Sequence, residues 1–189
     1  MSINREEAME LFLKYNETDA LIQHGLQVEA VMMHFAQYFD EDVEKWGVVG
    51  LCHDLDYEKY PEEHCKKTRE ILEAEGWPEE YIRAIVSHGW GICSEEKPES
   101  LMERTLFAID ELTGIINAAC LLRPSKSVLD LNLKSLNKKF KDKKFAAGCN
   151  RDIILQGIEM LEMDKNVVFE ETIKGLQKRA DICGLKGEL

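Results

Sequence analysis

The sequence predicts an all-α protein folded as a compact helical bundle. Apolar residues recur at three- or four-residue intervals along most of the chain, which is the period of an α-helix. Alternating runs of β-branched residues bounded by turns, which indicate strands, do not occur. The four prolines, at positions 61, 78, 98 and 124, all fall between periodic segments, where proline is tolerated.

The length of 189 residues suits a single domain, 1–189, with a substantial core. Periodicity is weakest over 123–150, which is polar and rich in lysine. The periodic segments predict helices at 4–15, 18–39, 42–54, 63–75, 79–88, 99–122, 127–138, 150–161 and 166–183.

The predicted helix 18–39 carries two histidines in different settings. Thr18 is a suitable N-cap. His24 lies on the apolar stripe of this helix, which faces the core. The neighbours of His34 at helical spacing are mostly small or polar, so we expect His34 at the surface. The stripe consists of Leu21, Val28, Val31, Phe35 and Tyr38.

The next predicted helix ends in the doublet His53-Asp54, and His53 shares an inward face with Trp46. Gly47 and Gly50 precede the doublet by one or two turns. Glycine costs a helix about 1 kcal/mol relative to alanine. Two glycines here therefore indicate either close approach of another backbone or space left beside the doublet.

Three later helices each bring a titratable residue inward or to a helix end. His64 opens the helix 63–75, and His88 closes the helix 79–88. Asp110 lies in the middle of 99–122, beside an apolar stripe. A carboxylate in that position is costly unless it is paired, protonated or bound to a metal.

Each of these residues alone has an ordinary interpretation as a hydrogen-bonded core residue. Together they are six inward-facing groups that need partners, and a divalent metal serves all of them. Imidazole and carboxylate donors suit Zn, Fe, Mn, Ni or Co better than Ca. The six are His24, His53, Asp54, His64, His88 and Asp110.

The order His24, His53-Asp54, Asp110 resembles the HD-domain superfamily of metal-dependent phosphohydrolases. The sequence HDLDYEKYPEEH…ILEAEGWPEEYIRAIVSHGWG is similar to the HDIG-type branch. This branch often has two additional histidines, and His64 and His88 match them. The resemblance covers about 18–125. It leaves a lysine-rich, C-terminal helical extension over about 126–189.

This resemblance implies a helical bundle that holds one or two divalent transition metal ions. It implies a first ion on His24, His53, Asp54 and Asp110, and a second on His64 and His88 with Asp54 as the bridge. Members of the superfamily hydrolyse phosphate esters, and a minority with two irons are oxygenases. We therefore expect a phosphohydrolase that acts on a small phosphorylated metabolite or nucleotide through metal-activated water. The alternatives are a di-iron oxygenase and a non-catalytic metal-binding regulatory module.

Two aspartates are the expected catalytic residues. Asp54 would fix a bridging water, and Asp56 would orient a ligand histidine; the alternative for Asp56 is a solvated acid at a helix end. Many HDIG-type proteins place Lys or Glu where this chain has Tyr57, and a phenol is a poor base near neutral pH. His64 also follows Asp54 by only ten positions, a shorter spacing than in several two-metal relatives.

Six lysines fall within 134–144, which is unusual in a chain of net charge −12. One interpretation is a rim that attracts a phosphorylated substrate, with Lys138 and Lys139 as the binding residues. The alternative is a solvated helix face. Three arginines are further candidates for a phosphate contact, none of them assigned: Arg104, Arg123 and Arg151.

Composition excludes several other functions. A net charge of −12 is unsuited to binding a nucleic-acid duplex, whose affinity comes from neutralised phosphates. The charged N-terminal segment does not resemble a signal peptide, and no apolar run approaches the roughly 20 residues of a membrane helix. Six cysteines without a C-x-x-C pair suit free thiols in a reducing cytoplasm. We therefore expect a cytoplasmic protein that does not bind membranes, and its oligomeric state stays open.

Overall fold

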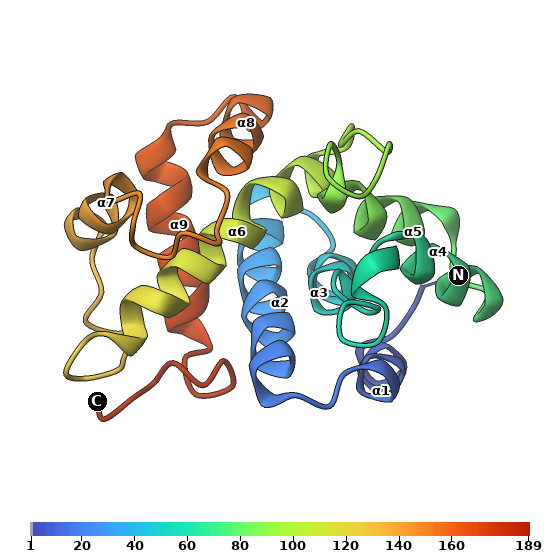
Figure 1. The fold of residues 1–189 in the computed structure, drawn as a ribbon, viewed down its shortest axis with the longest axis horizontal. Coiled ribbons are helices and arrows are strands. Elements are labelled where there is room, and N and C mark those ends of the chain that lie inside the picture. Colours follow the sequence, from blue (N-terminus) through green and yellow to red (C-terminus); the bar gives the residue numbers. More distant parts are fainter. Residues whose placement is uncertain (1) are drawn as a thin grey trace.

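The computed structural model describes residues 2–189, and in this range it contains α-helices and short 3-10 helices without a β-sheet (Figure 1). This confirms the all-α prediction. Over the same residues, no helix is both long enough and apolar enough to cross a membrane. The α-helices are α1 (Arg5–Tyr15), α2 (Asp19–Phe39), α3 (Val43–Cys52), α4 (Lys66–Ala74), α5 (Glu79–Val86), α6 (Leu101–Leu121), α7 (Leu133–Lys141), α8 (Arg151–Leu161) and α9 (Lys165–Lys178), and the 3-10 helices are η1 (Pro61–Glu63) and η2 (Ser87–Gly89).

Helix α2 is the central element and packs against α3, α6 and α9 (Figure 1). The contact with α3 is close because Gly50 faces the α2 backbone. A Cβ atom at Gly50 would lie 2.9 Å from the carbonyl oxygen of Val28 and 3.1 Å from Cα of Glu29. This confirms the expectation of close backbone approach, and it brings the end of α3 beside His24.

Long-range polar contacts hold helices α1 and α2 in place. Thr18 is the N-cap of α2, but its hydroxyl donates to Glu58 rather than capping the helix. The Glu29 side chain is only 2% exposed, and Arg5 of α1 donates two hydrogen bonds to it, at 2.5 and 3.0 Å. This pair ties α1 to the middle of α2.

Helix α6 crosses the molecule and begins with a capping box, in which Ser100 and Glu103 each bond the backbone of the other. Helix α8 packs directly on α6. A Cβ atom at Gly157 of α8 would lie 2.5 Å from Cα of Ala108, so only glycine fits there. The C-terminal helices are thus packed on the helices that carry the predicted metal ligands.

The predicted helix 127–138 is wrong in its bounds, because the observed helix α7 is Leu133–Lys141. Residues before it form turns, and the N–H of Val128 donates to the carbonyl of Leu185 near the C-terminus. Asn132 then starts the helix, since its side chain accepts a hydrogen bond from the backbone of Ser135.

One arginine holds the segment between α7 and α8. The Arg151 guanidinium donates to backbone carbonyls, including those of Phe140 at 2.8 Å, Asp142 at 3.0 Å and Phe145 at 2.5 Å. Weaker contacts reach the carbonyls of Ala146 and Cys149, both at 3.3 Å. The irregular chain of 142–150 is therefore wrapped around a single side chain.

The expectation that His34 lies at the surface is wrong, because His34 is only 8% exposed. Helix α9 covers it. Glu171 accepts a hydrogen bond from Nε2 over 2.7 Å, and the Lys178 ammonium donates to Nδ1 over 2.9 Å. Burial lowers the pKa of His34, although the hydrogen bond with Glu171 opposes that shift.

Candidate metal centre

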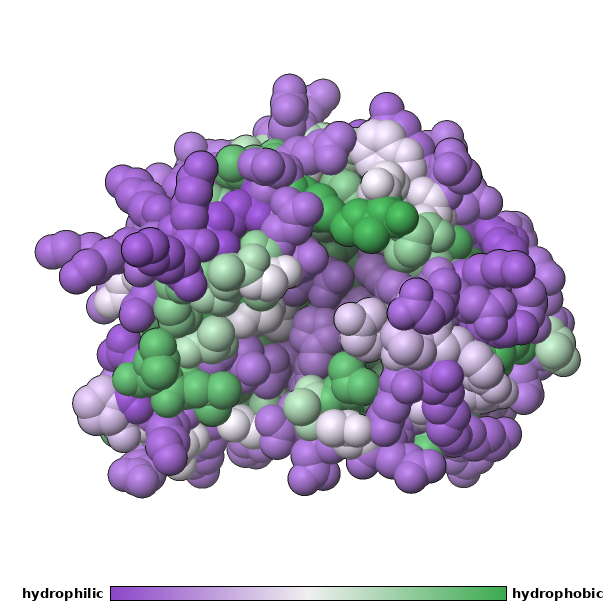
Figure 2. Space-filling model, viewed as in Figure 1, coloured by the Kyte–Doolittle hydropathy of each residue, from purple (hydrophilic) through white to green (hydrophobic). Residues whose placement is uncertain are grey.

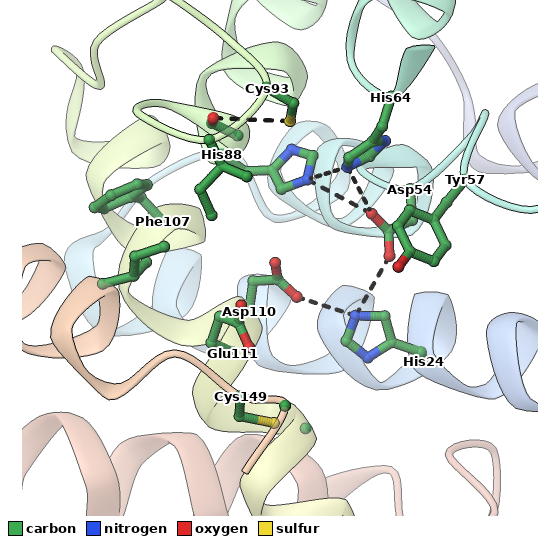
Figure 3. Close-up of a pocket in the computed structure, with 15 residues that line it drawn as sticks. His24, Asp54, Tyr57, His64, His88, Cys93, Phe107, Asp110, Glu111 and Cys149 are labelled. Atoms are coloured by element: carbon green, nitrogen blue, oxygen red, sulfur yellow. Dashed lines mark hydrogen bonds and ion pairs between the residues drawn. The ribbon is translucent and has the colours of Figure 1, made fainter. Parts of the chain in front are cut away.

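The predicted ligands surround a cavity of about 430 Å³ near the middle of the molecule. Figure 2 shows this face of the molecule hollowed near its centre, and Figure 3 shows the side chains around the cavity. His53 is fully buried behind the cavity wall. The other five predicted ligands line the cavity: His24, Asp54, His64, His88 and Asp110.

Four of the six side chains form one group of donor atoms. Nε2 of His24 lies 3.0 Å from Oδ1 of Asp110 and 3.2 Å from Nε2 of His53. Nε2 of His53 lies 3.3 Å from Oδ1 of Asp110 and 3.4 Å from Oδ2 of Asp54. Donor atoms bound at about 2.1 Å to one ion lie about 3.0–3.4 Å from each other. The spacing of His24, His53 and Asp110 therefore fits a single transition metal ion, and Oδ2 of Asp54 lies at the edge of this group, 3.7 Å from Nε2 of His24.

A second group lies on the other side of Asp54. Nε2 of His64 lies 3.2 Å from Nε2 of His88. Oδ1 of Asp54 lies 3.4 Å from the His64 nitrogen and 3.5 Å from the His88 nitrogen. The two oxygens of Asp54 thus face two different groups, as a carboxylate does when it bridges two ions. The sulfur of Cys65 also lies within 4.8 Å of the donor atoms of His64 and His88.

Three of the four histidines of the site are held by a hydrogen bond at Nδ1, so that Nε2 faces the centre. Nδ1 of His53 donates to the carbonyl of Gly50 over 2.8 Å, and Nδ1 of His88 donates to the carbonyl of Ile85 over 2.6 Å. Nδ1 of His64 donates to Asp56 over 2.6 Å. A hydrogen bond at one ring nitrogen fixes the tautomer and leaves the other nitrogen free to bind metal.

Asp56 is fully buried and does not line the cavity. One carboxylate oxygen accepts from His64, and the other accepts from the backbone N–H of Thr68 over 2.8 Å. These contacts favour the orienting role for Asp56 over that of a solvated acid. Asp56 therefore lies behind a predicted ligand and away from the cavity.

The charges of His53, Asp54 and Asp110 stabilise one another. Burial lowers the pKa of His53, but the neighbouring carboxylates of Asp54 and Asp110 outweigh burial and raise it well above its usual range. Burial likewise opposes ionisation of both carboxylates, and the charge of His53 outweighs it, so that both pKa values are held low. In the ion-free protein, protons on imidazole thus balance the carboxylates, and a metal ion would displace them.

Two further side chains of the cavity carry polar groups. Tyr57 is 46% exposed, and its ring meets that of His64 edge-on, with 5.1 Å between centroids. Glu111 lines the cavity beside Asp110, against Cys149 and the backbone of Asn150. Burial and the charge of Asp110 raise the pKa of Glu111. Sequence reasoning missed Glu111, because an isolated glutamate in an acidic helix carries no distinguishing signal.

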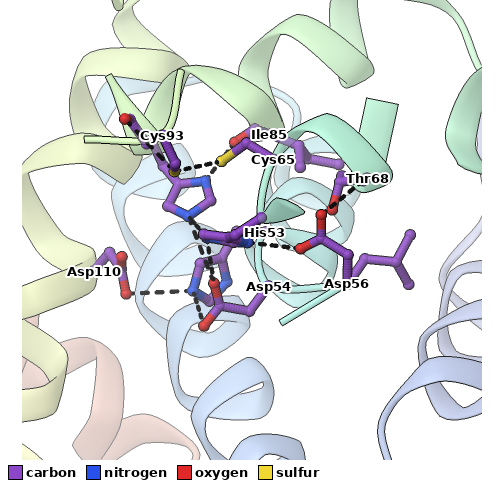
Figure 4. Close-up of polar contacts among 12 residues, drawn as sticks. His53, Asp54, Asp56, Cys65, Thr68, Ile85, Cys93 and Asp110 are labelled. Carbon is purple, nitrogen blue, oxygen red and sulfur yellow. Dashed lines mark hydrogen bonds and ion pairs between the residues drawn. The ribbon is translucent and has the colours of Figure 1, made fainter. Parts of the chain in front are cut away.

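A pair of thiols lies beside the second group and was also missed; Cys93 is exposed and lines the cavity, whereas Cys65 is buried. Sγ of Cys65 lies 3.2 Å from Sγ of Cys93 (Figure 4). The hydrogen bond from Cys65 and the positive charge of nearby histidines lower the pKa of Cys93 to about 6, against the opposing effect of burial. A Cβ atom at Gly89 would lie within 2.5 Å of both sulfur atoms, so Gly89 leaves the space that the pair occupies.

The structure does not bring the candidate phosphate-binding cations to this cavity. Lys138 lines a surface depression with Lys134, Lys141 and Lys165, and it lines another one with Lys139. The arginines are engaged elsewhere: Arg104 with the carbonyl of Met160, Arg123 with Asp130, and Arg151 with the 142–150 segment. Among residues 2–189, no lysine or arginine lines the metal cavity.

Comparison with known proteins bears on this arrangement. The family model described as HD domain matches residues 21–115, just over half of the chain. This match spans all six predicted ligands. No curated protein and no solved structure matches the chain. Because the HD-domain model matches more than half of the chain, the chain belongs to the HD-domain family.

Proposed function

We propose that this protein is a metal-dependent phosphohydrolase that acts on a small phosphate ester. The observation that carries the proposal is the position of Asp54, whose two oxygens each face a separate group of imidazole nitrogens. One or two transition metal ions bound there would activate a water molecule at neutral pH and hold phosphate oxygens. Mn, Fe, Co, Ni and Zn all suit the donor set.

The protein's own side chains would then have distinct roles. Asp54 would hold both metal positions at a fixed separation and orient the attacking water. Asp56 would keep Nδ1 of His64 protonated, so that Nε2 stays available as a ligand. Tyr57 would donate a hydrogen bond from its phenol to a phosphate oxygen or to the leaving group, since a phenol is a poor base near pH 7.

The completeness of the second group favours one alternative function. His64, His88 and Asp54 meet as closely as the first group does, which also suits a di-iron oxygenase. Such an enzyme would require redox-active iron at both positions and would consume oxygen. A hydrolase requires only Lewis acidity, so several metals would support its activity.

The test is metal analysis of protein purified without chelator, followed by a screen for phosphate release. The screen would offer phosphomonoesters and nucleotides with Mn²⁺, Co²⁺, Ni²⁺ or Zn²⁺. We expect near-stoichiometric metal and phosphate release with more than one of these ions. Oxygen consumption by a two-iron form, with no phosphate release under any metal, would overturn the proposal in favour of the oxygenase.

A further inference from the structure

Apart from the predicted metal ligands, the side chains around the metal cavity carry an unusual charge for a site that binds phosphate. In the part of the chain that the structure describes, no lysine or arginine lines it, and the three candidate arginines are bound elsewhere. Any positive charge for a phosphate must therefore come from the metal ions. A second phosphate or a carboxylate on the substrate would enter the cavity without a cationic partner.

Beyond the metal ligands, the wall of the cavity has two kinds of surface. Ile92, Phe107 and Ile153 are apolar, and small residues such as Gly114 and Gly148 leave room beside them. Ile92 is 66% exposed at the mouth, whereas Phe107 is almost fully buried. This surface suits a short carbon skeleton and offers it little hydrogen bonding.

Apart from the predicted metal ligands, Glu111 is the charged side chain among the described residues that line this cavity. It follows the ligand Asp110 on α6 and is partly buried. Among residues 2–189, no lysine, arginine or histidine forms an ion pair with its carboxylate. Its contacts with Cys149 and the backbone of Asn150 hold it at the side of the cavity. The carboxylate is therefore placed to accept a hydrogen bond from a group inside the cavity.

We infer that Glu111 selects the substrate: a phosphate monoester with a short organic part that carries an amine or a hydroxyl group. The phosphate would lie at the metal positions, and the donor group of the organic part would lie at Glu111. The same geometry disfavours esters with a second anionic group, because like charges in a confined site repel. This inference rests on the proposed function for the position of the phosphate.

The inference can be tested by binding, so that it does not depend on turnover. Three stable phosphonates of similar length serve as probes of the metal-loaded protein: 3-aminopropylphosphonate, propylphosphonate and 3-phosphonopropionate. Their free ends are cationic, neutral and anionic, respectively. We expect titration calorimetry to show that the amine binds about tenfold more tightly than the carboxylate, with the neutral probe between them. 3-Hydroxypropylphosphonate, as a fourth probe, separates a hydroxyl preference from an amine preference.

The variant Glu111→Gln keeps the shape of the side chain and removes its charge. We expect it to reduce the amine-to-carboxylate ratio to about twofold or less, with unchanged metal content. Glu111→Ala is a second variant in case the amide forms new hydrogen bonds. Glu159→Gln, on the exposed side of α8, is the matched control and should keep the wild-type ratio.

Each outcome is decisive for the inference. A ratio that stays the same in both Glu111 variants, or tightest binding of the carboxylate, would overturn it. Failure of all four phosphonates to bind the metal-loaded protein would also overturn it. The proposed function fails separately, if the phosphate-release screen is negative while the phosphonates still bind in the order that depends on Glu111.

Discussion

The carboxylate of Asp56 lies 2.6 Å from Nδ1 of His64, and this hydrogen bond determines which nitrogen of the ring faces the metal centre. The same carboxylate accepts the backbone N–H of Thr68, so both of its oxygens are occupied. The buried carboxylate raises the pKa of His64, although burial of the imidazole opposes that shift. Asp56 thereby joins the start of α4 to the second group of donors.

Replacement of Asp56 by asparagine should weaken the second metal position selectively. The amide can satisfy only one of the two donors that face it, so His64 loses its orientation. Loss of such a partner typically costs 10–100-fold in metal affinity. Metal titration should show one weakened and one unchanged position, whereas the exposed control Asp181→Asn should show neither change. Equal weakening of both positions would mean that Asp56 supports the fold rather than His64.

Removal of a ligand from the first group should abolish binding there. Nε2 of His53 and Oδ1 of Asp110 lie 3.3 Å apart, and the variants His53→Ala and Asp110→Ala each delete one of these two donor atoms. We expect loss of the ion that co-purifies at the first position, measured by elemental analysis. His34→Ala serves as the control, because His34 contacts α9 rather than the cavity. Unchanged metal in both ligand variants would contradict the assignment of this group.

Metal removal should lower the stability of the protein. An ion that binds only the folded state contributes about 2.7 kcal/mol at a concentration of 100 times Kd. Chelation should therefore lower the melting temperature of the wild-type protein by several degrees. The His53→Ala variant, already impaired at the first position, should respond less. Identical melting curves before and after verified loss of metal would indicate that the six side chains satisfy one another.

The pair His34–Glu171 predicts a loss of stability on acidification. Burial lowers the pKa of His34, so below about pH 6.5 the unfolded chain binds a proton that the folded state resists. The pKa of Glu171 is also low, because hydrogen bonds from Lys174 and His34 outweigh burial, and its contribution is lost at still lower pH. His34→Gln removes the histidine contribution. In chelator, the melting temperature of wild type minus that of the variant should fall from about pH 7.5 to about pH 5.5. Parallel curves would refute this account.

Two glycines of one helix should respond differently to alanine. Alanine normally favours a helix by about 1 kcal/mol. At Gly50 the new Cβ would meet backbone atoms of α2, which cannot move aside easily. We therefore expect Gly50→Ala to destabilise the fold by about 1–3 kcal/mol. It should also weaken metal binding, because it displaces His53. At Gly47 the nearest atom belongs to the flexible side chain of Met33, so Gly47→Ala should be much milder. Denaturant unfolding of both variants would measure the difference.

Local sequence periodicity predicted most of the helices, although His64, expected to open the helix 63–75, precedes α4, which begins at Lys66. His24 and Asp110 were identified because an imidazole or a carboxylate on an apolar stripe needs a partner, wherever that partner comes from. The same reasoning failed for His34, whose partners are on a helix 137 positions later in the chain. A local sequence pattern does not predict which distant helix will pack over a given face of another helix.

Weak periodicity explains the other difference in the fold. The segment around 127–138 is polar, so caps and turns decide where its helix begins. Asn132 places that start at Leu133, and the bond between Val128 and Leu185 holds the preceding turn. The position of Glu111 in the cavity depends on where it lies along α6 and on the path of the 142–150 segment. A local sequence pattern predicts neither of them.

The way in which Arg151 holds that segment has a consequence for how the protein can change. Every hydrogen bond that it donates is to a main-chain oxygen, an atom that all twenty residue types present alike. The hydrogen bonds of Arg151 therefore place no requirement on the side chains of the carbonyls that accept them. Gly148 and Cys149 of this segment already line the cavity. Substitutions at Gly148 or Cys149 can thus change this wall of the cavity while Arg151 keeps its hydrogen bonds and the helices that carry the predicted ligands stay unchanged.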